Sequence, residues 1–179
     1  MIDKIKILVL NGPNLNLLGE REPHIYGRTT LEEIDVQYVD WGRKHSIQVE
    51  CFQSNSEGTL IDRIQEERFS VSGIILNAGA YTHYSYALRD CISAIRIPVI
   101  EVHLTNPQAR EEFRKTSLIG PVVTGTISGF GPYGYILALQ AMKNMIEHTE
   151  RTRNSKKEIH PVDDAMAGRL INRRDQREE

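Results

Sequence analysis

The sequence predicts a doubly wound α/β domain built on a five-stranded parallel sheet. Apolar runs rich in β-branched residues alternate along the chain with segments of helical spacing. Several runs, such as ILVL and GIIL, are apolar at every position, which is typical of parallel strands that are buried on both faces. The length of 179 residues disfavours a (β/α)₈ barrel, which takes roughly 250 residues.

The predicted strands follow these apolar runs in order. They are residues 5–10 (IKILVL), 47–53 (IQVECFQ), 71–76 (VSGIIL), 97–103 (IPVIEVH) and 122–127 (VVTGTI). The predicted helices lie between or after them, at residues 30–45, 58–69, 85–95 and 133–148. We expect a helical connection after each of the first three strands and one more helix after the last, so that both faces of the sheet are covered.

The first helix has the clearest pattern. Its apolar residues recur at spacings of three and four, at Leu31, Ile34, Tyr38 and Trp41. Thr29 or Thr30, followed by two glutamates, predicts its start. Before the last helix, the glycine-rich run GTISGFGPYG (125–134) is interpreted as a structural turn, with a proline at the helix start.

The end of the chain differs in composition from the rest. Residues 149–179 contain eight basic and seven acidic residues, so 15 of 31 positions are charged, and their apolar residues are few and scattered. So little apolar surface does not offset the entropy of ordering the segment alone. We therefore expect one folded domain over residues 1–148 and a flexible charged tail over residues 149–179.

Composition excludes several function classes. The 22 basic and 24 acidic residues give a net charge of -2, so no global field attracts nucleic acid or an acidic membrane. No run approaches the roughly 20 apolar residues of a membrane helix, and the first residues lack the apolar region of a signal peptide. We expect a cytoplasmic protein that binds neither nucleic acid nor membrane, with Cys51 and Cys91 buried, reduced and inert.

Polar residues follow three of the predicted strands, where ligands bind in doubly wound sheets. They are the residues of NGPN (11–14), NAGAYTH (77–83) and the end of IPVIEVHLTN (97–106). Glu101 and His103 stand two apart on one strand, so their side chains share a face. A carboxylate there can orient the imidazole as a general acid, although a lone histidine at a strand end is more often a packed or surface residue.

Two further segments allow both a functional and a structural interpretation. The loop over residues 18–27 is either a catalytic lid that carries Arg21 and Tyr26 or a solvated surface loop. Arg110 and Arg114 lie four apart and share a face if they form a short helix. They are either a clamp for a substrate carboxylate or solvated charges.

Two other kinds of site have weak support in the sequence. His83 with Glu101 and His103 could ligate a metal, but their spacings match no zinc motif. The segment NGPN matches neither phosphate-binding loop, GxxxxGK[ST] or GxGxxG. We therefore expect no metal and no nucleotide.

Five segments, in this order, closely resemble type II 3-dehydroquinate dehydratases. They are NGPNLNLLGEREPHIYG, NAGAYTHYSYALRD, IPVIEVHLTN, AREEFR and GTISGFGPYGY, and the resemblance covers about residues 5–148. It implies a flavodoxin-like catalytic domain that needs no cofactor. It also implies removal of water from 3-dehydroquinate to give 3-dehydroshikimate, in the shikimate or quinate pathway, by homo-oligomers in which trimers pack into a dodecamer.

The resemblance also implies a role for each matching residue. Tyr26 is the base that removes the proton alpha to the ketone, and Arg21 activates it. Asn14 stabilises the enolate oxygen, while His103, oriented by Glu101, protonates the departing hydroxyl. The side chains of Asn77, His83 and Arg114 and the backbone at Leu104 and Thr105 bind the substrate. Asp90 reaches toward the site of a neighbouring subunit.

Three alternatives remain. A Schiff-base dehydratase is disfavoured because no lysine lies near the predicted strand ends. A catalytically inactive scaffold is disfavoured because every motif residue is present, and a nucleotide binder because no phosphate loop is. The departures from the usual family pattern, at Ala78, Pro107–Gln108 and Lys115–Thr116, remove none of these residues.

Overall fold

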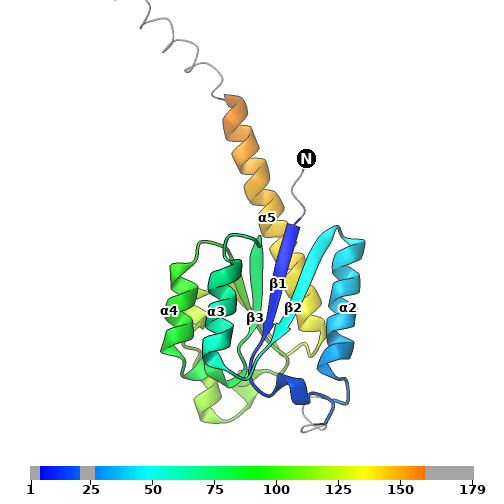
Figure 1. Cartoon of the computed structure of the whole chain (residues 1–179), viewed down its shortest axis with the longest axis vertical. Coiled ribbons are helices and arrows are strands. Elements are labelled where there is room, and N and C mark those ends of the chain that lie inside the picture. Colours follow the sequence, from blue (N-terminus) through cyan, green and yellow to red (C-terminus); the bar gives the residue numbers. More distant parts are fainter. Residues whose placement is uncertain (1–4, 21–26, 160–179) are drawn as a thin grey trace, which may run out of the picture. The chain divides into compact units, whose positions relative to one another are not determined.

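The computed structural model describes residues 5–20 and 27–159, and in this part of the chain five parallel strands form one sheet (Figure 1). The strands are β1 (Ile5–Asn11), β2 (Ile47–Gln53), β3 (Gly73–Asn77), β4 (Val99–His103) and β5 (Gly125–Ser128). Their order across the sheet is β2-β1-β3-β4-β5. The α/β fold class is therefore confirmed, and the strand order reverses direction at the β1/β3 boundary.

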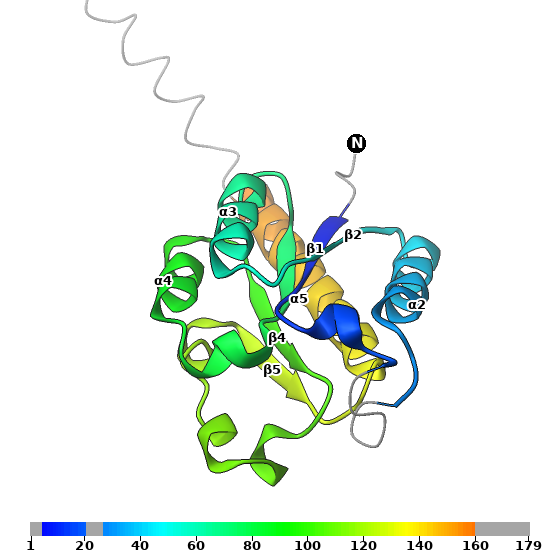
Figure 2. The same cartoon turned by 60° about the horizontal axis from the view of Figure 1, so that its bottom comes forward.

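Helices cover both faces of the sheet (Figures 1 and 2). They are α2 (Leu31–Lys44), α3 (Glu57–Glu67), α4 (Tyr86–Ala94) and α5 (Tyr133–Ile159). Leu8 and Leu10 of β1 point to the face covered by α3 and α4, where they join a buried apolar cluster. On the other face, Tyr38 of α2 contacts Tyr135 of α5. Both faces are thus buried, as the continuous apolar runs predict.

Side-chain caps fix where three helices begin. Thr30 accepts a hydrogen bond from the backbone N–H of Glu33, and the Glu33 carboxylate accepts one from the Thr30 N–H, which forms a capping box. The hydroxyl of Ser56 caps α3 by accepting from the N–H of Thr59, and that of Ser85 caps α4 by accepting from the N–H of Leu88. The predicted start of the first helix is confirmed. Its buried face includes Gly42, however, while Trp41 is only half-buried.

Three predicted strands begin later than the apolar runs suggest. β3 begins at Gly73 and β4 at Val99, directly after Pro98. The largest difference concerns β5, since Gly120–Val122 form a short 3₁₀ turn that contains Pro121. The N–H groups of Val122 and Val123 donate to the carbonyl of Ile119 in this turn, so they are not offered to a neighbouring strand, and β5 starts only at Gly125. Val122 and Val123 pack against the core without pairing in the sheet.

The glycine-rich run before α5 is a turn, as interpreted from the sequence. Gly129 and Gly131 have φ values of 88° and 56°, a region that residues with a Cβ rarely adopt. The turn is bonded to the end of β4, because the N–H groups of these two glycines donate to the carbonyls of His103 and Leu104. It therefore helps to position the residues that follow β4.

Helix α5 continues to Ile159, 11 residues beyond the predicted end at His148. The chain divides into two compact units, Met1–Lys143 and Asn144–Glu179, and the first contains all five strands. The predicted helix end depends on apolar content, which reports packing rather than backbone preference, and the flexible charged tail over residues 149–179 stays a prediction. Residues 149–159 contain no glycine or proline, so nothing in their sequence interrupts the helix.

Two further observations concern membrane-spanning helices and the cysteines. No helix within the described ranges is both long and apolar enough to cross a membrane. Both cysteines are free thiols, but only Cys91 is buried, whereas Cys51 is half-buried. Burial nevertheless raises the pKa of Cys51 to about 11, so this thiol stays protonated at neutral pH.

Candidate active site

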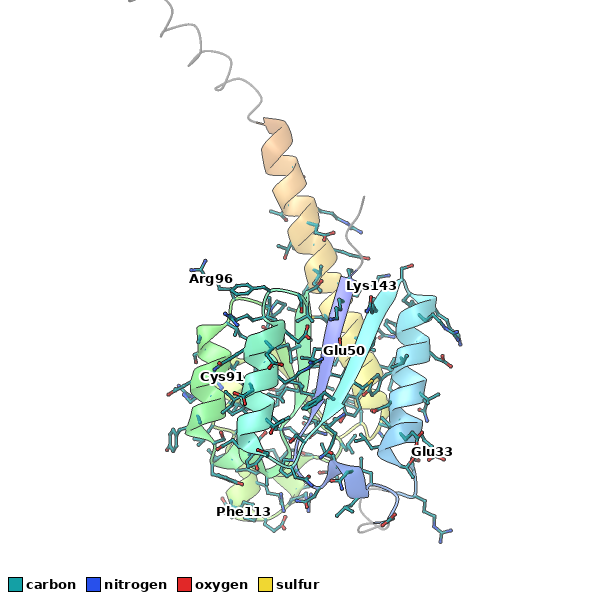
Figure 3. The ribbon with its side chains drawn as sticks, in the orientation of Figure 1. Glu33, Glu50, Cys91, Arg96, Phe113 and Lys143 are labelled. Atoms are coloured by element: carbon teal, nitrogen blue, oxygen red, sulfur yellow. The ribbon has the colours of Figure 1, made fainter. Side chains whose placement is uncertain are left out.

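A cavity of about 110 Å³ lies at the carboxyl ends of β1, β3 and β4. Figure 3 shows the orientation: Phe113 marks this end of the domain and Arg96 the opposite end. The cavity is lined by Pro13, Asn14, Leu15, Leu18, Asn77, Gly79, Ala80, His83, His103, Leu104, Thr105, Pro107, Arg110 and Arg114. It spans the boundary where the strand order reverses, which is where doubly wound sheets bind ligands.

Glu101 and His103 form the most strongly organised pair at this end of β4. The His103 Nε2 atom lies 2.8 Å from Oε1 of Glu101, so the predicted common face is confirmed. The Glu101 side chain is completely buried, whereas the His103 side chain is 12% exposed and borders the cavity. Because Nε2 bonds to the carboxylate, Nδ1 is the nitrogen that His103 can offer to a molecule in the cavity.

Three hydroxyl groups surround the Glu101 carboxylate. Thr82 donates to Oε1 at 3.0 Å, Ser117 lies 3.1 and 3.2 Å from the two oxygens, and Thr126 donates to Oε2 at 3.3 Å. Burial raises the pKa of this carboxyl, but the hydrogen bond and charge of His103, together with the hydroxyl groups, hold the pKa below its ordinary value. Glu101 is therefore an ionised carboxylate that orients the imidazole of His103.

His83 lies beside His103. The two rings are nearly parallel, with centroids 6.5 Å apart, and His83 Nδ1 is 2.8 Å from the carbonyl oxygen of Thr116. Since Nδ1 donates to that carbonyl, Nε2 of neutral His83 is an acceptor. Within the described part of the chain, no group of three His, Cys, Asp or Glu residues is arranged to hold a metal ion.

Asn14 lies three residues beyond the end of β1, in a strained backbone conformation. Its φ of 65° lies in the left-handed region, which asparagine tolerates better than most residues. The backbone N–H of Asn14 donates to Oδ1 of Asn55 at 2.9 Å, and Asn55 in turn accepts from Gln53 at 3.0 Å. The loop that follows β2 therefore holds Asn14 at the cavity.

Asn77, the last residue of β3, is 3% exposed and lines the cavity. Its Nδ2 atom donates to the hydroxyl of Tyr135 at 3.0 Å, and its Oδ1 accepts from the N–H of Gly79 at 3.3 Å. The Tyr135 hydroxyl donates to Oδ1 of Asn11 at 2.6 Å. Two polar contacts thus hold the carboxamide of Asn77 in one orientation.

Arg110 and Arg114 both reach the cavity, but not from one helix. The segment folds as two short 3₁₀ turns, Pro107–Ala109 and Glu112–Lys115, with Arg110 extended between them. The predicted short helix is therefore wrong, because an extended residue separates the turns. The two Nε atoms lie 3.4 and 2.9 Å from Oε2 of Glu111, and this shared carboxylate aligns the two cations beside the cavity.

The sequence model described as "Dehydroquinase class II" matches residues 5–143. This chain belongs to the class II dehydroquinases. The "3-dehydroquinate dehydratase" of Anoxybacillus flavithermus is 52% identical over 143 residues, which cover 80% of this chain and 97% of that protein. The corresponding protein of Thermotoga maritima is 48% identical over 143 residues, or 80% and 98% of the two chains.

Solved structures of class II dehydroquinases have the same fold. The crystal structure of a type II dehydroquinase from Butyrivibrio crossotus matches with a TM-score of 0.77 and 49% identity, covering 78% of this chain and 97% of that one. A "3-dehydroquinate dehydratase-like protein" from Bifidobacterium longum matches with a TM-score of 0.62 and 31% identity, covering 80% and 98%. The flavodoxin-like architecture implied by the resemblance is therefore that of the family.

The structure of this class II dehydroquinase brings most of the predicted site residues together. Asn14, Asn77, His83, His103, Leu104, Thr105 and Arg114 all line the cavity, and Glu101 lies directly behind His103. Asp90 is exposed on α4 and does not line the cavity. Arg21 and Tyr26 lie outside the described residues, so their roles stay predictions.

Sequence reasoning missed several residues of this class II dehydroquinase that support the site. They are the hydroxyl donors Thr82, Ser117 and Thr126, Gln53 at the end of β2, Asn55 in the loop that follows it, and Tyr135 of α5. Thr82 carried one signal, since it directly precedes His83 after a predicted strand. Most of the others lie far along the chain from the site residue that they support: 16 residues for Ser117, 25 for Thr126, 41 for Asn55 and 58 for Tyr135.

Proposed function

We propose that this chain is a 3-dehydroquinate dehydratase, a hydro-lyase that removes water from 3-dehydroquinate to give 3-dehydroshikimate. The proposal rests first on the Glu101 and His103 pair, because loss of a hydroxyl as water at neutral pH needs a proton donor beside the substrate. The identity of 48 to 52% to proteins named for this activity, over almost their entire length, supports it. Dehydration would serve the shikimate or quinate pathway.

The proposed mechanism needs a base and an acid that act at different positions. Tyr26, as a phenolate, removes the proton alpha to the ketone, and the electron pair of the broken C–H bond forms an enolate. Asn14 supplies a hydrogen-bond donor to the enolate oxygen. His103, protonated, then gives its proton to the departing hydroxyl, which leaves as water while the enolate collapses to the conjugated enone. The tyrosine has gained one proton and the histidine has lost one, so exchange with solvent resets the site.

Substrate binding is proposed for the polar groups around the cavity. The cations that share Glu111 suit a carboxylate, with Arg114 as the main contact because a guanidinium binds a carboxylate through two hydrogen bonds. Asn77, His83 and the backbone at Leu104 and Thr105 would bind the hydroxyl groups. In an assembly of trimers packed into a dodecamer, the exposed Asp90 would reach the site of a neighbouring subunit.

A lysine-based mechanism has no support at this cavity. None of the described residues that line it is a lysine. Lys115 lies nearby, but its Nζ atom pairs with Glu112 at 2.6 Å and its side chain is 41% exposed. A Schiff base needs a deprotonated amine beside the ketone, and an exposed ion-paired ammonium does not provide one.

An absorbance assay tests the proposed function. Purified protein should convert 3-dehydroquinate to the conjugated enone, whose ultraviolet absorbance rises with time, both with and without a metal chelator. A His103→Ala variant, purified in the same way, controls for dehydratase from the expression host and should lose most of the rate. If folded wild-type protein binds 3-dehydroquinate but forms no enone, the chain is an inactive family member and the proposal is wrong.

Deletion of residues 149–179 is expected to leave turnover and fold nearly intact. All five strands and every described candidate residue precede residue 149, and the deleted segment is half charged with few apolar residues. Turnover, circular dichroism and sedimentation of the truncated chain check this result. An insoluble product, or one that assembles differently from the full chain, would assign residues 149–179 a structural role instead.

A further inference from the structure

A buried chain of three polar side chains leads from the interior to Asn77. It runs from Asn11 at the end of β1 through Tyr135 in the first turn of α5 to Asn77 at the end of β3. All three side chains are nearly inaccessible, with residue exposures of 0, 0 and 3%. Only Asn77 also borders the cavity, so this residue connects the interior chain to the proposed substrate.

The direction of each hydrogen bond in this chain follows from the number of protons. The tyrosine hydroxyl has one proton, and at 2.6 Å it is given to Oδ1 of Asn11. The hydroxyl therefore meets Asn77 as an acceptor, which requires the NH₂ group of Asn77 to face it. The N–H of Gly79 donates to the other end of the carboxamide, so Oδ1 of Asn77 must face Gly79. A flipped carboxamide would place donor against donor at Gly79.

Tyr135 is itself firmly held. Its ring contacts the ring of Tyr38, with centroids 5.2 Å apart and planes inclined by 34°. Burial raises the pKa of Tyr135 above its ordinary value and outweighs the hydrogen bond from Asn77, which lowers it. The hydroxyl therefore keeps its proton at neutral pH, and the direction of these hydrogen bonds does not change under assay conditions.

We propose that Tyr135 is a positioning residue that acts through Asn77: its hydroxyl fixes the Asn77 carboxamide so that the second N–H of Nδ2 is presented to a hydroxyl group of the substrate. The inference rests on the proposed function of the cavity. Tyr135 is not itself a lining residue, so any effect of its hydroxyl on substrate must pass through a neighbour. Asn77 is the neighbour that both bonds to the hydroxyl and lines the cavity.

The test compares Tyr135→Phe with Tyr38→Phe. The two tyrosines are a matched pair, since both are buried, their rings touch, and each hydroxyl donates to a side chain, that of Tyr38 to Asp35. Tyr38→Phe loses the hydrogen bond to Asp35, whereas Tyr135→Phe loses the one to Asn11 and the one from Asn77. Both variants should therefore be destabilised, Tyr135→Phe somewhat more. We expect Tyr135→Phe alone to raise KM about tenfold with kcat changed less than about threefold, because uniform binding is lost. An unchanged KM, or an equal rise in both variants, overturns the inference.

A double-mutant cycle separates action through Asn77 from a general disturbance. In an Asn77→Ala background, Tyr135→Phe should no longer change KM, because the group that it positions is absent. If the rise in KM persists in that background at full size, Tyr135 acts by another route and the inference is wrong. Urea unfolding of the four proteins reports whether each comparison is made on folded enzyme.

A spectroscopic measurement keeps the inference independent of activity. In the wild-type protein, nuclear magnetic resonance should show that the two Nδ2 protons of Asn77 exchange with solvent at different rates. The proton that is hydrogen-bonded to Tyr135 should be the protected one. Rapid exchange of both protons at the same rate overturns the inference even if Tyr135→Phe cannot be purified folded. Conversely, protection of one proton in a protein that forms no enone would mean that the proposed function fails while the geometry stands.

Discussion

Replacing Glu101 with glutamine is expected to lower kcat by about a hundredfold or more, which is the scale of a lost general acid. The carboxylate accepts from His103 and from hydroxyl groups on three separate segments. A glutamine keeps the size of the side chain but replaces one acceptor oxygen with an NH₂ donor and removes the negative charge. The imidazole of His103 then loses the acceptor that orients it and the negative charge beside it.

Stability should fall in the same variant. Some of the hydroxyl groups that donate to Glu101 would face the NH₂ donor of the glutamine. An unsatisfied buried donor costs about 1–3 kcal/mol. The pKa of Glu101 is lowered in the folded protein relative to 4.5. The carboxylate therefore contributes to the free energy of unfolding above about pH 4.5, and this contribution is lost as the pH falls through the lower folded pKa. The stability difference between wild type and variant should shrink in acid.

A matched control is Glu112→Gln. Glu112 lies in a nearby 3₁₀ turn, pairs only at the surface with Lys115, and its side chain is 86% exposed. An exposed pair contributes at most about 1 kcal/mol, so this variant should keep its kcat and its stability. Enone absorbance gives kcat, and urea unfolding at several pH values gives the free energy. A kcat for Glu101→Gln within about threefold of wild type would remove Glu101 from its proposed role.

Replacing Tyr26 with phenylalanine is expected to abolish nearly all turnover, by about a thousandfold or more, while affinity for a product-like ligand is retained. The variant loses only the oxygen that would accept the substrate proton. Turnover and ligand affinity are measured separately, by enone formation and by calorimetry. Tyr84→Phe makes the same chemical change at a residue that is 58% exposed and does not line the cavity, so it should behave as wild type. Activity of Tyr26→Phe within tenfold of wild type would require another base.

The proposed partner of Tyr26 gives this prediction a pH dependence. A free phenol has a pKa of about 10, so only about one in a thousand is ionised at pH 7, and a neighbouring guanidinium lowers such a pKa by ~1–3 units. Arg21→Ala should therefore depress kcat and move its alkaline dependence upward, and Arg21→Lys should recover only part of the loss. If Arg21 only binds substrate, KM rises while the pH profile of kcat stays in place.

Local sequence patterns were sufficient for the strand and helix order and for the end of the sheet that carries the site. Continuous apolar runs identify buried parallel strands, and the rule that ligands bind at their carboxyl ends directs attention to Asn14, Asn77 and His103. The pairing of Glu101 with His103 also follows locally, because residues two apart on a strand share a face. Each of these inferences needs only neighbours along the chain.

Local patterns failed where a boundary depends on more than apolar spacing. The spacing of Arg110 and Arg114 predicts a shared helix face, but the backbone is extended at Arg110. The apolar run at 122–127 begins as a strand in sequence, but the turn at Pro121 delays pairing until Gly125. Residues 149–159 lack a core-forming pattern, yet they continue helix α5 because helix formation needs backbone hydrogen bonds rather than burial.

The sequence by itself determined which residues reach the carboxyl end of the sheet, and only the tertiary structure decided what surrounds them. Thr82, Ser117 and Thr126 converge on Glu101 from three segments, and Tyr135 meets an asparagine 58 residues away. Hydroxyl groups and tyrosines of this kind occur throughout the chain without a period or motif. Their function is conferred by distance in space, because a hydrogen bond forms at about 3 Å whatever the separation along the chain.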